Sequence, residues 1–266
     1  KRHGYSDEIL VTRNNKIATV VLNRPDQRKA INYQMWMDLQ RIMIDLADDP
    51  DVNVIIFHGA GERAFSAGAD IKDFELYRNN ASKAALHEAA VTGALDAIAY
   101  CPKPTISMIN GYCVGGGCEL AIATDIRIAS EGSRFGIPVA RLGILIANKE
   151  MRRLVDLVGR GNAMYILLSA RLLDTNEALR MGLLNNVVPS ADLETYVSTL
   201  ATEIAALAPL SHSGNKEILH SVIANPDMDL MTPDEHEFQL SNFDTEDFQE
   251  GRRAFLEKRK PVFKGY

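Results

Sequence analysis

The part of this 266-residue sequence best suited to chemistry is a run of three glycines closely followed by a carboxylate. Gly115, Gly116 and Gly117 precede an apolar stretch of helix type, and Glu119 falls in its first turn. Glycines cost conformational entropy, but here they let a bound group reach the first-turn N–H donors, where the helix dipole favours negative charge. Such a cradle beside a carboxylate predicts a reaction that builds negative charge on an oxygen while a proton moves.

The glycine run has a purely structural alternative, in which it only allows a helix and a strand to pack closely and Glu119 complements the helix dipole. The run is not a Walker loop or a dinucleotide fingerprint, because no Gly-Lys-Ser/Thr follows and the Gly-x-Gly-x-x-Gly spacing is absent. A second segment, residues 64–71, offers the other half of a site. Its small residues Ala67, Gly68 and Ala69 precede a predicted helix, so their backbone N–H groups can also face a ligand.

Strands and helices alternate around these two segments. Short β-branched runs predict strands at 9–12, 16–22, 52–58, 105–109, 125–129, 134–136 and 186–188. Apolar periodicity and capping residues predict helices at 33–47, 72–100, 149–159, 162–169 and 175–181. From about residue 190 the pattern is almost entirely helical, at 191–207, 211–224, 232–242 and 246–257. We therefore predict an α/β core over 1–195 and a helical C-terminal region over 196–266.

The composition narrows the class of protein. A net charge of −6 and a pI near 5.6 argue against general nucleic-acid binding, and no apolar run is long enough for a membrane span. Three cysteines within one short stretch and six scattered histidines show neither a disulfide framework nor metal-ligand spacing. The N-terminus lacks the apolar core of a signal peptide. These features predict a cytoplasmic enzyme or binding protein with no metal.

Taken in order, segments along nearly the whole chain resemble the crotonase superfamily, the enoyl-CoA hydratase/isomerase family. The matching segments are Leu22–Pro25, Ala30–Asn32, Phe65–Ile71, Pro102–Pro104, Asn110–Ala121, Phe135–Pro138 and Lys260–Phe263. The resemblance implies a spiral of strand–strand–helix turns that forms two crossed sheets, followed by a helical trimerisation region. It also implies a homotrimer or a hexamer built as a dimer of trimers.

For chemistry, the resemblance implies an acyl-CoA thioester substrate and no cofactor apart from the coenzyme A that the substrate carries. The backbone N–H groups of Ala69 and Gly116 would bind the thioester oxygen as it becomes an enolate, with Glu119 as the acid/base. The positions expected to bind the CoA substrate are Arg28, Lys29, Ala67, Gly68, Asp70, Ile71, Gly115, Val139 and Phe263. Surface charge explains Arg28 and Lys29 equally well, and Asp70 is also placed to cap the following helix.

One departure from the family pattern bears on the reaction. A family hydratase uses two glutamates to hold one water; the first matches Glu119, but Val139 stands where the second would follow Pro138. Glu119 alone suffices to move a double bond, and apolar neighbours such as Val139 would raise its pKa towards neutrality. Glu150 could supply a displaced second carboxylate, although a Lys-Glu pair on a helix predicts exposure.

The sequence therefore predicts an acyl-CoA enzyme of the hydratase/isomerase class that stabilises a thioester enolate. Hydration, double-bond isomerisation by Glu119 alone, and other enolate reactions such as decarboxylation or C–C cleavage remain open at this stage. A second class, a non-catalytic CoA-thioester binder or assembly protein, would keep the backbone cradle but would not need Glu119. RNA binding is the reading that the acidic charge disfavours most.

Overall fold

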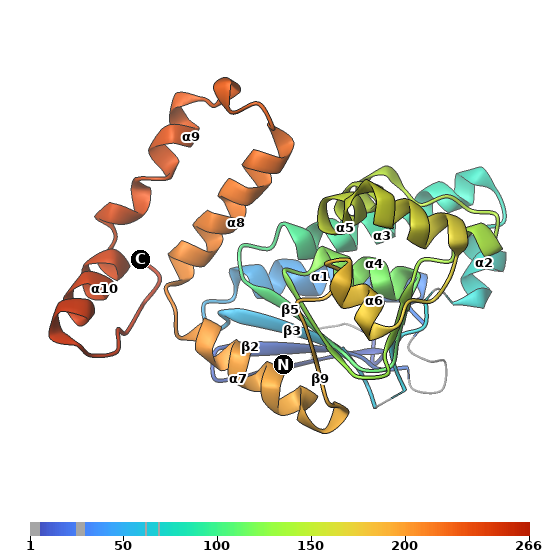
Figure 1. Ribbon diagram of the computed structural model, residues 1–266, viewed down its shortest axis with the longest axis horizontal. Helices are drawn as coiled ribbons and strands as arrows, with labels where there is room; N and C mark the ends of the chain where they lie inside the picture. Colours follow the sequence, from blue (N-terminus) through green and yellow to red (C-terminus); the bar gives the residue numbers. More distant parts are fainter. Residues whose placement is uncertain (1–5, 25–29, 62, 69) are drawn as a thin grey trace.

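A six-stranded sheet forms the centre of the protein in the computed structural model, which describes residues 6–24, 30–61, 63–68 and 70–266. Its strand order is β1-β2-β3-β5-β7-β9, and Figure 1 labels β2, β3, β5 and β9 of this sheet. β1 and β2 form an antiparallel hairpin, and every later strand pairs in parallel with its neighbour. The strands are β1 (Ile9–Asn14), β2 (Ile17–Leu22), β3 (Val54–Gly59), β5 (Thr105–Ile109), β7 (Ile126–Ser130) and β9 (Asn186–Val188).

A second, parallel sheet contains three short strands, β4 (Ala64–Ser66), β6 (Tyr112–Val114) and β8 (Arg134–Gly136). Each follows closely on a strand of the main sheet, so the chain passes from β3 to β4, from β5 to β6 and from β7 to β8. Gly111 makes the turn between β5 and β6 at a φ of +78°, and a Cβ there would lie 2.2 Å from the Arg63 carbonyl oxygen. Close turns such as this one let a strand of the small sheet follow a strand of the main sheet directly. Residues of both sheets then contribute to one core.

The central strands are buried on both faces because helices cover both sides of the main sheet. Ile55 and Phe57 of β3 join the larger core cluster, whereas Val54 and Ile56 join a second cluster, as the two-residue period of a strand requires. The second cluster packs against α7 (Leu193–Ala205). The opposite face carries α1 (Tyr33–Asp48), α3 (Ala81–Ala99), α4 (Gly116–Ala123), α5 (Asn148–Ser169) and α6 (Thr175–Arg180) (Figure 1).

Two helical predictions are refined by the structure. The predicted helix at 72–100 is divided into α2 (Ile71–Tyr77) and α3, and Asn80 caps α3 by accepting a hydrogen bond from the Lys83 N–H at 3.0 Å. The predicted helices at 149–159 and 162–169 form one element, α5, in which Gly159 has a non-helical φ of +76° and makes a kink. The kink keeps the two halves of α5 distinct in direction.

The C-terminal region is a helical arm that extends away from the core (Figure 1). It contains α8 (Pro209–Ala224), α9 (Pro233–Phe238) and α10 (Glu246–Glu257). No residue of α8 or α9 is buried, and Leu219, Leu240 and Phe255 expose large apolar side chains. The predicted boundary at 195/196 lies within α7, which packs on the sheet, so the arm itself begins after this helix.

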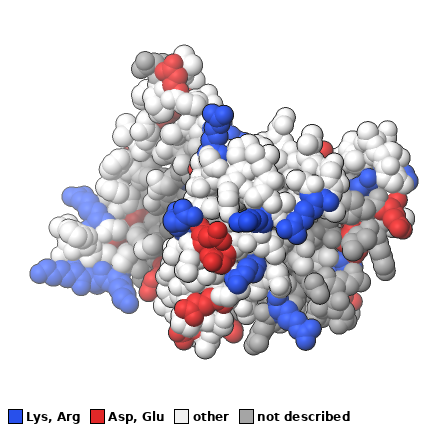
Figure 2. Space-filling model, turned by 45° about the vertical axis from the view of Figure 1, so that its right-hand side comes forward, with Lys and Arg blue, Asp and Glu red and all other residues white. Residues whose placement is uncertain are grey.

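The surface mixes the two signs of charge. On the face shown in Figure 2, acidic and basic side chains are interspersed and do not gather into one continuous basic surface. None of the helices in the described part of the chain is both long enough and apolar enough to cross a membrane.

The packing of α4 against β4 depends on a missing side chain at Gly117. A Cβ at this position would lie 2.5 Å from the Ser66 Cβ and 2.8 Å from the Ser66 carbonyl oxygen. We expect Gly117→Ala to lower the free energy of unfolding by about 1–3 kcal/mol, the usual cost of overpacking a core. Denaturant unfolding measures the effect.

Gly161→Ala is the matched control, because Gly161 lies in the helical part of α5 with open space around its Cβ position. We expect this change to be neutral or to stabilise by about 0.5–1 kcal/mol. Equal effects from both substitutions would show that Gly117 is not sterically required.

Candidate active site

The two segments that the sequence paired as halves of a site lie in direct contact. A Cβ on Gly115 would lie 3.5 Å from the Gly68 Cα, and one on Gly68 would lie 3.3 Å from the Val114 carbonyl oxygen. Both glycines have positive φ, +55° at Gly115 and +109° at Gly68, a conformation that larger residues rarely adopt. The turn before α2 and the start of α4 therefore approach each other backbone to backbone.

The first turn of α4 is held in a fixed direction. The Gly115 N–H donates to the Gly136 carbonyl oxygen at 2.8 Å, which ties this turn to β8. α4 then begins at Gly116, where the amide has no acceptor within the helix. A Cβ on Gly116 would lie 3.0 Å from the Trp36 ring, so the indole supports this backbone from below.

A buried arginine holds the segment that precedes α2. Arg24 pairs with Asp70 at 2.7 Å, donates to the Ala30 carbonyl oxygen at 2.7 Å and pairs with Glu8 at 2.9 Å. The Gly68 carbonyl oxygen accepts a hydrogen bond from the Ile31 N–H at 3.0 Å. Asp70, through its ion pair with Arg24, thus helps to hold this turn in place.

Several predicted positions cannot be placed beside these amides. Ala69, Arg28 and Lys29 lie outside the described residues. Ile71 begins α2, but its side chain is also outside the description. Ala67 is partly exposed next to Gly68. The predicted pairing of the Ala69 and Gly116 amides stays a prediction.

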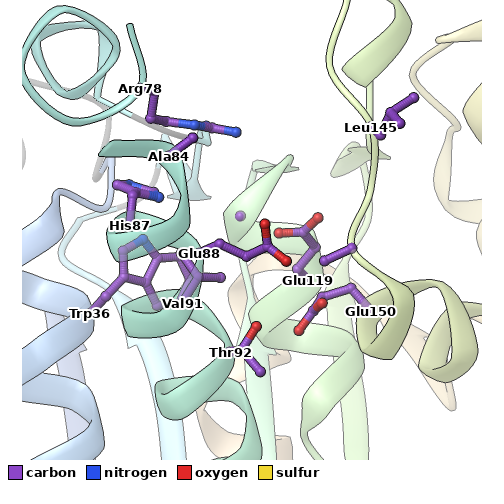
Figure 3. A pocket seen from close by; sticks show the side chains of 12 residues that line it. Trp36, Arg78, Ala84, His87, Glu88, Val91, Thr92, Glu119, Leu145 and Glu150 are labelled. Atoms are coloured by element: carbon purple, nitrogen blue, oxygen red, sulfur yellow. The ribbon is translucent and has the colours of Figure 1, made fainter. Parts of the chain in front are cut away.

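A cavity of about 120 Å³ lies between α3, α4 and α5, beside the start of α4. Figure 3 shows Glu88 of α3, Glu119 of α4 and Glu150 of α5 directed into it. The remaining lining residues are mostly apolar or carry nitrogen groups: Trp36, Arg78, Ala84, His87, Val91, Thr92, Gly116, Leu145 and Ala147. Three carboxylates, one arginine and a helix start therefore surround one small space.

Burial, and then the charge of Glu150, raise the pKa of Glu119, whereas Arg78 lowers it, and together these effects bring the pKa to about 7. The sequence predicted that apolar neighbours such as Val139 would desolvate Glu119. The lining residues are instead Leu145 and Ala147 from that loop, together with α3. A carboxyl group with a pKa near neutrality can both donate and accept a proton at physiological pH.

The expected exposure of Glu150 is wrong. Its side chain is 4% exposed, because the first turn of α5 faces α3 and α4 and not solvent. The Glu150 Oε1 atom pairs with Arg153 at 3.2 Å, and the Oε2 atom has no hydrogen-bond partner.

Val139 and Phe263 lie apart from the carboxylates of the cavity. Val139 begins a short 3₁₀ turn, Val139–Arg141, and packs against the larger core cluster. Phe263 lies in the C-terminal arm, in a groove between α8 and α10, where its ring contacts the Gly251 position. Within one chain, neither joins the residues that line the cavity.

The sequence interpretation missed the contribution of α3. Ala84, His87, Glu88, Val91 and Thr92 all line the cavity, at the three- and four-residue spacing of one helical face. That periodicity could have identified the stripe once Glu119 was chosen as its target. Burial, followed by the charge of Arg78, lowers the pKa of His87 to about 4, so this ring is neutral near pH 7.

Comparison with known proteins agrees with this arrangement. The family model described as enoyl-CoA hydratase/isomerase matches residues 12–266. The probable enoyl-CoA hydratase echA8 of Mycobacterium tuberculosis is 36% identical over 258 residues, which cover 97% of this chain and 98% of the relative. The short-chain-enoyl-CoA hydratase of Clostridium acetobutylicum is 34% identical over 255 residues, 96% of each chain.

A solved structure shows the same fold. The crystal structure of an enoyl-CoA hydratase/carnithine racemase from Magnetospirillum magneticum superimposes with a TM-score of 0.91 at 38% identity, covering 97% of this chain and 96% of the other. The two-sheet α/β architecture with C-terminal helices is therefore confirmed as the crotonase fold.

The fold and the site together define an enzyme that acts on CoA thioesters. The chain belongs to the enoyl-CoA hydratase/isomerase family.

The raised pKa of Glu119 predicts a pH-dependent cost in stability. Because its folded-state pKa of about 7 exceeds the ordinary 4.5, the folded protein binds this proton more tightly than the unfolded chain. The cost in folding free energy therefore grows as the pH rises from about 4.5 to about 7, and it is complete above this range. Glu119→Gln removes the charge, and we expect it to stabilise the protein by up to about 3 kcal/mol near pH 8.

This difference should shrink towards zero below about pH 5. Chemical denaturation at several pH values measures it, with Glu194→Gln on the exposed side of α7 as the matched control. A pH-independent difference between wild type and Glu119→Gln would contradict the raised pKa.

Proposed function

We propose that the protein interconverts 2-enoyl-CoA and 3-hydroxyacyl-CoA thioesters, with Glu119 as the acid/base that exchanges a proton with the α-carbon. The observation that carries this proposal is the position of Glu119, which has a pKa of about 7, in the first turn of a helix whose glycine start opens on the same cavity. The relatives named as a short-chain-enoyl-CoA hydratase, a crotonyl-CoA hydratase and a carnitinyl-CoA dehydratase support this choice of reaction.

The start of α4 supplies the electrostatic part of the proposal. The Gly116 N–H and the positive end of the helix dipole favour the oxyanion over the neutral thioester carbonyl. The Ala69 N–H is the proposed second donor. A donor that acts mainly on the developing charge lowers the barrier rather than merely tightening substrate binding, and one such donor is worth roughly 3–4 kcal/mol.

Glu119 supplies the proton transfer. A carboxyl group is most effective as an acid/base when its pKa lies near the working pH, because both protonation states are then populated. The burial that raises the pKa of Glu119 meets this condition. Trp36 and Val91 line the cavity, where their apolar side chains would limit the access of bulk water to a bound thioester.

Double-bond isomerisation is the second candidate. Val139 occupies the position where a family hydratase would carry its second glutamate, and one carboxylate suffices to move a proton between two carbons of a dienolate. The two reactions differ in whether water is incorporated into the product.

The proposal includes an assembly of three copies or two sets of three. Its support is the helical arm, which projects from the core and exposes Leu219, Leu240 and Phe255. Exposed apolar surface of this kind marks an interaction site. In such an assembly, Phe263 of one copy and Arg28 and Lys29 of another would complete the coenzyme A site.

A panel of CoA thioesters tests the reaction. We expect wild type to hydrate 2-enoyl-CoA substrates and Glu119→Gln to lower kcat by roughly 10²–10⁴-fold, the usual contribution of a general acid/base. Loss of absorbance of the conjugated thioester reports hydration, and product analysis in ¹⁸O-labelled water reports oxygen incorporation.

Conversion of 3-enoyl-CoA to 2-enoyl-CoA without any labelled product would favour the isomerase. Tight binding of every thioester with no turnover would show that the protein is a CoA-thioester binder and not an enzyme. Glu194→Gln again serves as the control for a charge change remote from the cavity.

A further inference from the structure

We propose that Glu150 is a second catalytic carboxylate, carried on the first turn of α5 and not on the turn after Pro138. Glu150 would accept the proton of the attacking water, and Arg153 and Asp96 would hold it in position. The inference rests on the proposed function, because it assigns a residue to the hydration step that Glu119 begins.

The first support is an unsatisfied oxygen. Glu150 is 4% exposed, its Oε2 atom has no hydrogen-bond partner, and the side chain lines the same cavity as Glu119 (Figure 3). Leaving a buried carboxylate oxygen without a donor is costly, and such groups call for a specific explanation. A water or substrate hydroxyl in the cavity would supply the missing donor.

The second support is a clamp that fixes the other oxygen. Arg153, one turn further along α5, donates to the Glu150 Oε1 atom at 3.2 Å and also pairs with Asp96 of α3. Lys149 pairs with the second oxygen of Asp96 at 2.5 Å. The clamp joins α3 to α5 and leaves the Oε2 atom of Glu150 as the oxygen without a partner.

The third support is electrostatic coupling between the two carboxylates. The charge of Glu150 is the second cause, after burial, of the raised pKa of Glu119. Two nearby carboxyl groups in unlike environments suit an acid and a base in one step. Glu119 is then the proton donor, and Glu150, paired with Arg153, is the base.

The proposed step balances without a further reactant. The oxygen of a water held at the Glu150 Oε2 atom forms a bond to C3, and Glu150 takes one of the water's protons. The C2=C3 electrons move towards the thioester, giving an enolate at the start of α4. Glu119 delivers its proton to C2 as the enolate collapses, and proton transfer from Glu150 to Glu119 through cavity water restores the starting state.

A structural role for Glu150 is the competing explanation. A glutamate in the first turn of a helix complements the dipole, and a pair with Arg153 three residues away stabilises a helix surface. That role would not explain a buried oxygen without a partner in a residue that lines the cavity, and its loss would change stability more than the rate.

The test compares Glu150→Gln with Glu119→Gln and Glu88→Gln, since Glu88 contributes the third carboxylate of the cavity. We expect Glu150→Gln to lower kcat for 2-enoyl-CoA hydration by at least 100-fold, with the Kd for a saturated acyl-CoA within experimental error of wild type and no fall in the thermal midpoint. The pH–rate limb assigned to Glu119 should move to lower pH, because a neutral neighbour no longer raises its pKa.

Arg153 provides an independent test as a positioning residue. Arg153→Met should lower kcat by about tenfold with little change in Kd, and Arg153→Lys should recover part of the loss.

Hydration by Glu150→Gln within threefold of wild type would overturn the proposal, as would an equal loss in Glu88→Gln. A fall in thermal midpoint and in acyl-CoA binding that parallels the loss of rate would assign Glu150 a structural role instead. Failure of the proposed function is distinguishable, because wild type would then show no turnover that depends on Glu119.

Discussion

The site depends on a close contact between two turns of the chain, which glycines on at least one side of each contact make possible. The approach of Gly68 to Gly115 and of Gly117 to Ser66 brings the segment before α2 against the start of α4. Both strands that lead into this contact, β4 and β6, pair in the same small sheet, so the turns that follow them emerge on one side. The pairing of β4 with β6 therefore fixes where the amide donors of the following turns lie. A rigid scaffold of this kind can orient such groups towards a developing charge.

A buried ionic framework surrounds this contact. Arg24 fixes the turn before α2 through Asp70, and Arg153 fixes the turn at the start of α5 through Glu150 and Asp96. In both cases the arginine joins segments that are distant in the sequence. The two networks differ in their hydrogen bonding. The Arg24 guanidinium bonds three separate groups, whereas in the Arg153 network Glu150 keeps one oxygen without a partner. We therefore assign Arg24 a structural role and Arg153 the role of a residue that positions Glu150.

Much of the fold could be predicted from sequence, because local signals determined it. Asn32 caps its helix, and successive apolar residues of β3 face two cores in turn. The helix start that Asn80 caps was missed, because residues 72–100 were predicted as one helix. The glycine run and Glu119 could also be predicted as part of a site, because their residue types and spacing indicate the chemistry. Glu150 was not, because a Lys-Glu pair on a helix predicts exposure and only the tertiary position of α3 against α5 buries it. The cavity stripe on α3 escaped for the same reason: a helix shows its periodicity in the sequence but not what each face meets.

The substitution at Val139 then has a physical explanation within this fold. Val139 packs into the core beside the loop that precedes α5, while Glu150 enters the cavity from the start of that helix. A carboxylate on a helix anchored by Arg153 and Asp96 is held by two ion pairs, whereas one on the short Val139–Arg141 turn would depend on that turn alone. In the proposed reaction, a base on the more rigid element would keep two carboxylates at one water, with the apolar Val139 where a family hydratase carries its second glutamate. Because the charge of Glu150 also raises the pKa of Glu119, the same relocation maintains the acid as well as supplying the base.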